Sequence, residues 1–275
     1  MKAELSPFTP GQPVPIEFFV GRVKEIEQLV SMIRAATAGK FRVGYVAGER
    51  GIGKSSLVSF VRHLAEREER TAGAHVFWGG VDSLPEMVRK IFDRLLKDSL
   101  EKPWYQKIRD LFGKHVKQIG LFGITVELDL ADTEARTLVT GFAPSLRRLL
   151  AELKDDRRAL LLILDDINGL AASVEFANWL KSFVDEVATS GNSLAACVLV
   201  VGLEQRRRQL IELQPSLARV FELVQIQRWS EEETKDFFAR AFRNAQADVE
   251  PPALQTMVKF SGGIPVLAHE IGDAV

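Results

Sequence analysis

Short apolar runs alternate along the chain with segments in which apolar and polar positions follow a helical spacing. The apolar runs predict strands at residues 41–47, 74–81, 159–164, 195–201 and 221–227. Between them, apolar residues recur three and four positions apart, as at Ile26, Leu29, Val30 and Ile33. Because strands and helices alternate, the sequence predicts an α/β fold with a doubly wound parallel sheet.

Two segments depart from this alternation. Residues 82–156 are too many for a single crossover and predict a mostly helical insertion, in which residues 120–128 alternate around glycines like a hairpin. After residue 228 only helical patterns follow, and the first helix starts with a capping box, Ser230 and Glu233. We therefore predict a core domain over 1–228 and a small helical domain over 229–275. Whether a further domain follows is left open.

Aromatic and apolar residues of the insertion have two interpretations. They form either a contact surface or, as is commoner, the packing of the insertion onto the core. The residues are Trp104, Tyr105, Leu121 and Phe122.

A glycine-rich loop follows the first predicted strand and precedes a helix. Its sequence fits the phosphate-binding pattern G-x-x-x-x-G-K-[ST], in which glycines let backbone N–H groups surround an anion. Lys54 is predicted to contact the β- and γ-phosphates, and Ser55 to bind Mg²⁺. The residues predicted to bind the nucleotide here are Gly48, Glu49, Arg50, Gly51, Ile52, Gly53, Lys54, Ser55 and Ser56.

A second motif completes the first. Residues 159–164 form a continuous apolar run that ends in Asp165 and Asp166, a pattern typical of a buried parallel strand whose carboxyl end meets a ligand. Asp165 is predicted to hold the Mg²⁺ shell and Asp166 to polarise the attacking water. Two acids capping the next helix are the alternative.

Composition excludes several classes of function. The 36 basic and 37 acidic residues give a net charge of −1, so no global field attracts nucleic acid or membranes. The basic runs 147–148, 157–158 and 206–208 are interpreted as solvated faces. One cysteine excludes an internal disulfide framework, and the absence of a signal or membrane-spanning pattern favours a cytoplasmic protein. The four histidines show no metal-ligand spacing.

Several motifs in their expected order carry a family resemblance. They are Phe19-Val20-Gly21-Arg22, the two motifs above, Arg228-Trp229-Ser230-Glu231-Glu232-Glu233 and Gly262-Gly263-Ile264-Pro265. Together they resemble the AAA+ and STAND ATPases, and more narrowly the prokaryotic relatives of origin-recognition initiators and transposition-regulator ATPases. The resemblance implies a five-stranded AAA+ core with a helical lid, and ATP or ADP with Mg²⁺ as ligands.

The resemblance also implies roles for residues outside the two motifs. Val20 and Gly21 would lie against the adenine, and Ile264 and Pro265 would close over the base or ribose. Arg219 would serve as an arginine finger for a neighbouring subunit, so a homo-oligomer is expected in the ATP state. An ordinary surface position is the alternative for Arg219.

Two departures from the family pattern bear on activity. The strand Cys197 to Gly202 lacks the polar residue that usually ends it, although Glu204 or Gln205 could replace it. Val266 stands where transposition-regulator relatives carry an arginine, so the variant in which proline senses the nucleotide fits better.

Two functions remain open. One is a slow, oligomerising ATPase that engages DNA or a protein partner; the other is an ADP/ATP switch that barely turns over. A metabolic kinase is a distant third, because the sequence shows no pattern that indicates a phosphoacceptor pocket.

Overall fold

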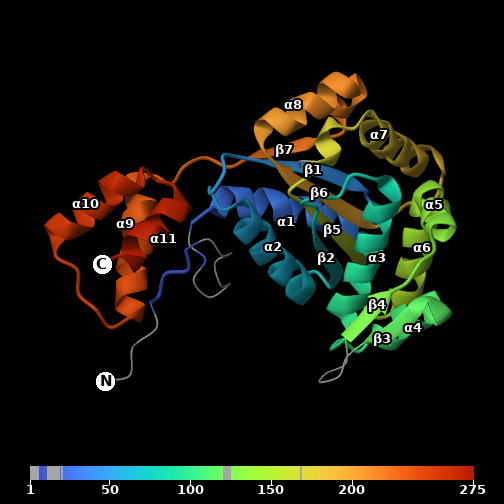
Figure 1. Ribbon diagram of the computed structural model, residues 1–275, viewed down its shortest axis with the longest axis horizontal. Coiled ribbons are helices and arrows are strands. Elements are labelled where there is room, and N and C mark those ends of the chain that lie inside the picture. The colour runs from blue at the N-terminus through green and yellow to red at the C-terminus, as the bar shows by residue number, and fades with distance from the viewer. Residues whose placement is uncertain (1–5, 11–18, 20, 120–124, 168) are drawn as a thin grey trace.

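The computed structural model describes residues 6–10, 19, 21–119, 125–167 and 169–275. Within them the predicted strands form a five-stranded parallel sheet in the order β2-β5-β6-β1-β7 (Figure 1). The strands are β1 (Arg42–Ala47), β2 (Thr71–Phe77), β5 (Ala159–Asp165), β6 (Ala196–Gly202) and β7 (Glu222–Gln225). The predicted α/β fold is thereby confirmed. Because the strands are parallel, the glycine-rich loop after β1 and the acidic pair at the end of β5 share one edge of the sheet.

The second strand begins at Thr71 and ends at Phe77, which corrects the predicted span of 74–81. Arg70, with a φ of 54°, redirects the chain into the strand. At the other end, the N–H of Val81 donates to the Trp78 carbonyl at 3.0 Å, and Gly80 has a φ of 84°. The β-forming residues of the sequence thus continue into a turn, so apolar character alone misplaces the strand.

Helices cover both faces of the sheet. On one face, α1 (Val23–Thr37) and α2 (Lys54–Glu68) pack against β1, β5 and β6. On the other lie α3 (Leu84–Ser99), α6 (Phe142–Leu153), α7 (Val174–Thr189) and α8 (Glu204–Leu213). Short 3-10 helices, η3 (Leu170–Ala172) and η4 (Pro215–Arg219), connect elements on this second face. The three-layer arrangement buries every residue of β5 and β6.

The insertion is built from α3 and α6 together with smaller elements. These are α4 (Tyr105–Phe112), η2 (Gly113–His115), β3 (Val116–Ile119), β4 (Thr125–Leu128) and α5 (Asp132–Thr140). The strands β3 and β4 pair antiparallel, which confirms the hairpin, although its first strand begins earlier than predicted. Leu121 and Phe122 lie outside the described residues.

Trp104 and Arg157 join the insertion to the rest of the core. Trp104 is buried, and Tyr105 packs partly buried against the main core cluster, so both pack the insertion. The guanidinium carbon of Arg157 lies 3.7 Å from the centre of the Trp104 ring. The prediction that residues 157–158 form a solvated face is therefore wrong for Arg157, because the aromatic ring covers its cation.

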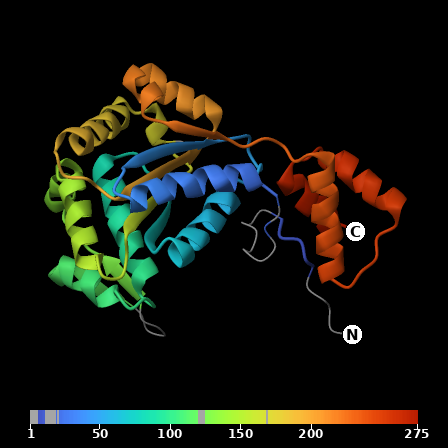
Figure 2. The ribbon, with the colours of Figure 1, turned by 180° about the vertical axis from the view of Figure 1, so that it is seen from behind.

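The C-terminal helices α9 (Glu231–Asn244), α10 (Pro251–Ser261) and α11 (Pro265–Asp273) form a hydrophobic cluster of their own. They stand to one side of the sheet in both ribbon views (Figures 1 and 2). The capping box of α9 is confirmed, since the Glu233 N–H donates to Ser230 Oγ at 3.1 Å and the Ser230 N–H donates to Glu233 Oε2 at 2.8 Å. The N-terminal residue Phe8 completes this cluster, with its ring 5.4 Å from that of Phe242.

Candidate nucleotide-binding site

The glycine-rich loop joins the end of β1 to the start of α2. Gly51 and Gly53 have φ values of 75° and 89°, a region that residues with side chains rarely adopt. A Cβ atom on Gly48 would lie 2.8 Å from the Ile52 side chain. The glycines therefore allow the backbone to curl tightly, and α2 begins immediately afterwards at Lys54. The N–H groups of the first turn of α2 and the positive end of the helix dipole meet at this point.

Lys54 links the loop to the acidic pair. Its ammonium group donates hydrogen bonds to the carbonyls of Gly48 at 3.2 Å and of Glu49 at 2.8 Å. Burial lowers the pKa of Lys54, and the charges of Asp165 and Asp166 act in the opposite direction. The cation and both carboxylates therefore belong to one electrostatic environment, although more than a hundred residues separate them in the sequence.

Asp165 is held by a residue that the sequence did not single out. Its carboxylate is 3% exposed, and Oδ2 lies 2.9 Å from Nε2 of the buried His75. An ionised carboxylate only accepts hydrogen bonds, so this His75 nitrogen is the donor. The pairing of β2 with β5 brings the two residues together. The histidine spacing in the sequence gives no sign of this pair, because the two residues lie 90 positions apart.

Asp166 has surroundings unlike those of Asp165. It is exposed, and its φ of 58° turns the chain sharply at the end of β5. A Cβ atom on Gly79 would lie 3.5 Å from Asp166 Oδ2, so the carboxylate extends toward the turn that follows β2. The two neighbouring acids thus point into different environments, one buried and one open to solvent.

Arg22 is a second site residue that sequence reasoning left without a function. It is buried, and its guanidinium donates to the carbonyls of Gln227 and, at 3.2 Å, of Ile52. Glu25 lies 3.6 Å away, and the ring of Trp229 lies 5.9 Å from the guanidinium carbon. Burial lowers the pKa of Arg22, against the opposing effect of Glu25. One side chain thus connects the entry segment, the glycine-rich loop and the segment leading to α9.

The start of α11 packs directly on the glycine-rich loop. The Val266 N–H donates to the Gly51 carbonyl at 3.2 Å. A Cβ atom on Gly53 would lie 3.8 Å from Pro265, and one on Gly51 would overlap with Val266 and lie 3.9 Å from Ile264. Ile264 and Pro265, predicted from the family motif, therefore lie over the predicted phosphate-binding glycines.

Gly21 lies where the core meets the C-terminal helices. A Cβ atom there would be 3.1 Å from Glu233 Oε1 and 3.6 Å from the indole Nε1 of Trp229. This indole nitrogen is buried and has no hydrogen-bond partner among the described residues. A buried N–H that the described residues leave unpaired can donate to a water molecule or a ligand.

The remaining predicted residues are placed as follows. Ser55 is partly buried in the first turn of α2, next to the buried Ser56. Glu49 and Arg50 are exposed, and Glu49 pairs with Arg228 at 2.9 Å. Val20 lies outside the described residues. Arg219 ends η4 and is exposed, and within the described part of the chain no hydrogen bond or ion pair joins it to the glycine-rich loop.

Glu204 is a predicted substitute for the missing polar residue after β6, and its carboxylate already pairs with two arginines of α8. Its carboxylate accepts from Arg207 at 2.6 Å and from Arg208 at 3.2 Å. These hydrogen bonds, that of Arg207 above all, lower the pKa of Glu204. Arg206 donates instead to Gln209 at 2.7 Å. Of the basic run 206–208, Arg208 is exposed as expected for a solvated face, whereas Arg206 and Arg207 are partly buried.

A family model described as the AAA ATPase domain matches residues 19–201. The chain belongs to this family. As an AAA ATPase domain it carries the P-loop of an ATP-binding family, and the glycine-rich loop above is that P-loop. A comparison with curated proteins gives no match.

Solved structures with the same fold include a Walker-type ATPase, an ORC2 protein and a Cdc6p protein. The Walker-type ATPase of Pyrococcus abyssi is 18% identical with a TM-score of 0.61, and the match covers 93% of this chain and 67% of that one. The ORC2 protein of Aeropyrum pernix, solved as ADPNP-ADP complexes, is 14% identical with a TM-score of 0.63. That match covers 98% of this chain and 64% of the ORC2 chain. Cdc6p of Pyrobaculum aerophilum is 13% identical with a TM-score of 0.58, and the match covers 96% of this chain and 62% of the Cdc6p chain. The AAA ATPase chain thus spans about two thirds of each of these structures.

Of the helices in the described part of the chain, none has both the length and the apolar character needed to cross a bilayer.

Proposed function

We propose that this AAA ATPase domain binds ATP with Mg²⁺ between its P-loop and the start of α11, and hydrolyses it slowly. The observation that carries the proposal is the geometry of the P-loop. Gly51 and Gly53 curl the backbone at positive φ just before α2, and Lys54 lies across the loop on the carbonyls of Gly48 and Glu49. Lys54 is half-buried and lies within the electrostatic influence of Asp165 and Asp166, which suits the charges of a metal–triphosphate complex. Lys54 would exchange its bonds to the loop carbonyls for bonds to phosphate oxygens.

The oxygen donors near the P-loop suit Mg²⁺, which prefers hydroxyl, carboxylate and phosphate oxygens. Ser55 and Asp165 would hold the ion, and His75 leaves one oxygen of Asp165 available by occupying the other. Bound Mg²⁺ would neutralise charge on the phosphates. The exposed Asp166 would orient the attacking water and accept its proton.

The adenosine would lie near Gly21, Ile264 and Pro265. Two observations support this placement: the contacts of Ile264 and Pro265 with the P-loop, and the unpaired buried N–H of Trp229 beside Gly21. Because α11 touches the P-loop through Val266, the C-terminal helices would act as a lid whose position depends on the phosphates. Control of oligomerisation by the nucleotide would follow from this movement.

Arg219 would act on a neighbouring subunit. It is exposed and has no partner within the described residues, which leaves its cation available for a γ-phosphate in trans. A protein or DNA partner for the assembly rests on fold likeness alone: the ORC1 protein of Aeropyrum pernix, 13% identical with a TM-score of 0.54, was solved in complex with DNA.

The test is ATP hydrolysis per subunit as a function of protein concentration, with Lys54→Ala as the blank. Activity per subunit should rise with concentration, and Arg219→Ala should abolish the rise. Arg208→Ala is the matched control, because Arg208 is equally basic and exposed but already paired with Glu204. A rise that survives Arg219→Ala would exclude the finger.

The alternative is a switch that retains ADP and barely turns over. The shorter Asp166 in place of the usual Glu and the position of Val266 on the P-loop favour it. Absence of turnover above the blank, together with ADP that co-purifies with the wild type but not with Lys54→Ala, would replace the ATPase by the switch.

A further inference from the structure

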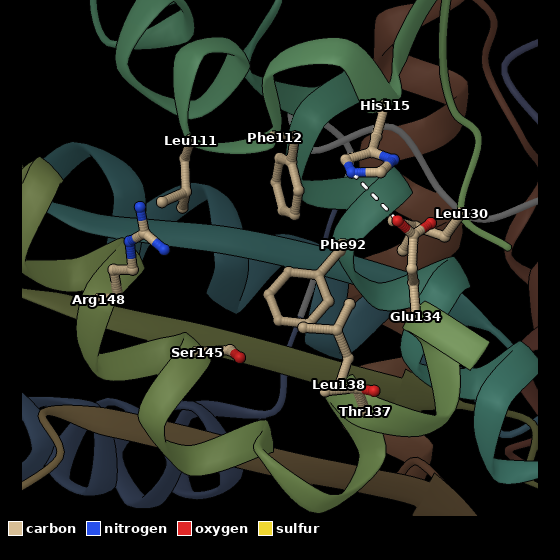
Figure 3. A pocket seen from close by; sticks show the side chains of 10 residues that line it. All are labelled: Phe92, Leu111, Phe112, His115, Leu130, Glu134, Thr137, Leu138, Ser145 and Arg148. Carbon is tan, nitrogen blue, oxygen red and sulfur yellow. Dashed lines mark ion pairs between the residues drawn. The ribbon is translucent and has the colours of Figure 1, made fainter. Parts of the chain in front are cut away.

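A second cavity lies in the insertion, formed by different elements from those of the P-loop site. It opens between α3, α4, α5 and α6 and has a volume of about 300 Å³ (Figure 3). This volume is at the lower end of the range for small-molecule sites. At about 30 Å³ for a water molecule, it has room for roughly ten non-hydrogen atoms.

The walls of the cavity are mainly apolar and aromatic. Their apolar members are Phe92, Leu111, Phe112, Leu130 and Leu138. Phe92 and Phe112 meet edge to face with ring centres 5.5 Å apart, and Phe92 lies at the centre of the view in Figure 3. Such walls favour a ligand with an aromatic or aliphatic body and disfavour a sugar, whose hydroxyl groups would be buried without partners.

Most polar groups at the rim are already bonded within the protein. Glu134 accepts from the Ala131 N–H at 3.0 Å through one oxygen, and its other oxygen lies 3.5 Å from His115. The Ser145 hydroxyl donates to the Gly141 carbonyl at 2.7 Å. A ligand amine would therefore find the one carboxylate of the rim occupied.

Arg148 is the exception. Among the described residues that line the cavity, it is the charged side chain for which no hydrogen bond or ion pair is formed. In Figure 3 it lies across the cavity from the His115–Glu134 pair. Its neighbour Arg147, by contrast, donates to Ser190 at 2.8 Å and to the Asn192 carbonyl at 3.1 Å. A guanidinium has five N–H donors and no acceptor. Arg148 is exposed, so water solvates it in the empty cavity and its donors are available to an anionic ligand.

We propose that this cavity binds a small organic acid, with an apolar body against Phe92 and Phe112 and a carboxylate on Arg148. The planar guanidinium matches a carboxylate in charge and in geometry. The site shares no residue with the P-loop, so the proposal stands or falls independently of ATP hydrolysis.

The experiment measures binding of 4-phenylbutyrate to the full chain by calorimetry, without nucleotide. Its amide and its amine analogue, 4-phenylbutylamine, serve as ligands of nearly the same shape and different charge. The acid should bind, and both analogues should bind at least about tenfold more weakly, because a hydrogen bond to a charged partner is worth more than a neutral one.

Three variants locate the acid. Arg148→Gln should weaken its binding about 10-fold to 100-fold, whereas Arg136→Gln, on the exposed side of α5 and outside the lining, should not. Leu138→Trp, which fills the cavity, should abolish binding. No binding of the acid to the wild type, equal binding of the amine, or an Arg148→Gln variant that binds as the wild type does would overturn the proposal.

Discussion

The hydrogen bond between His75 and Asp165 makes a prediction about metal affinity. His75→Leu removes the donor to a carboxylate that is 3% exposed, so no water replaces it easily. A hydrogen bond to a charged group is worth about 1.5–3 kcal/mol. Loss of a partner that orients a metal ligand typically costs 10–100-fold in affinity, or about 1.4–2.8 kcal/mol. The two estimates agree, and we expect Mg²⁺ affinity to fall by about that factor.

The assay is titration of Mn²⁺, in place of Mg²⁺, into the protein with ATP, monitored by electron paramagnetic resonance of the free ion. It reports metal binding whether or not ATP is hydrolysed. His75→Gln is the rescue variant, because its amide nitrogen can occupy nearly the position of Nε2 and donate to Asp165. His63→Leu, on the exposed side of α2, is the control.

Two results would contradict this role of His75. If His75→Leu binds Mn²⁺ as the wild type and His75→Gln do, then the hydrogen bond does not orient Asp165 for a metal. A loss shared equally by Leu and Gln would also refute it, since it would reflect the shape of the imidazole rather than its N–H.

Further predictions concern the contacts around the P-loop and the buried His269 of α11. Gly51→Ala should weaken ATP binding, measured by calorimetry, because the new Cβ meets Val266 at a φ of 75°; unchanged affinity would show that α11 yields freely. Arg22→Ala should lower the free energy of unfolding in urea by about 2–4 kcal/mol, whereas the exposed Lys24→Ala should have little effect. Burial lowers the pKa of His269 below its usual 6.5, so the unfolded chain binds this proton first, and stability should fall as pH decreases from 6.5. His269→Gln should flatten that decrease, measured by urea unfolding from pH 7.5 to 5.5.

The local motifs of the site could be read from the sequence because each is contiguous. The P-loop carries its glycines, lysine and serine within eight positions, and the acidic pair ends an uninterrupted apolar run. The parallel, five-stranded arrangement of the sheet followed from the alternation of elements and from the resemblance. These features depend on neighbours in the chain, which is why pattern reasoning finds them.

The partners of these motifs could not be read in the same way. His75 meets Asp165 only because β2 and β5 pair in one particular register, and no local signal specifies it. Arg22 was part of a recognised motif, but its bonds reach carbonyls 30 and 205 residues away. Backbone carbonyls carry no sequence signature. The misplaced bounds of β2 have a related cause, since β-forming residues fill both the strand and the turn after it.

Phe8 has a consequence for how the C-terminal cluster folds. Its ring lies in the cluster of α9, α10 and α11, and the Thr9 N–H donates to Nδ1 of His269 at 3.0 Å. Residues from the opposite end of the sequence therefore complete this small core. A chain without residues 8 and 9 would leave apolar side chains of these helices open to water. The two ends of the sequence thus depend on each other for the stability of one cluster.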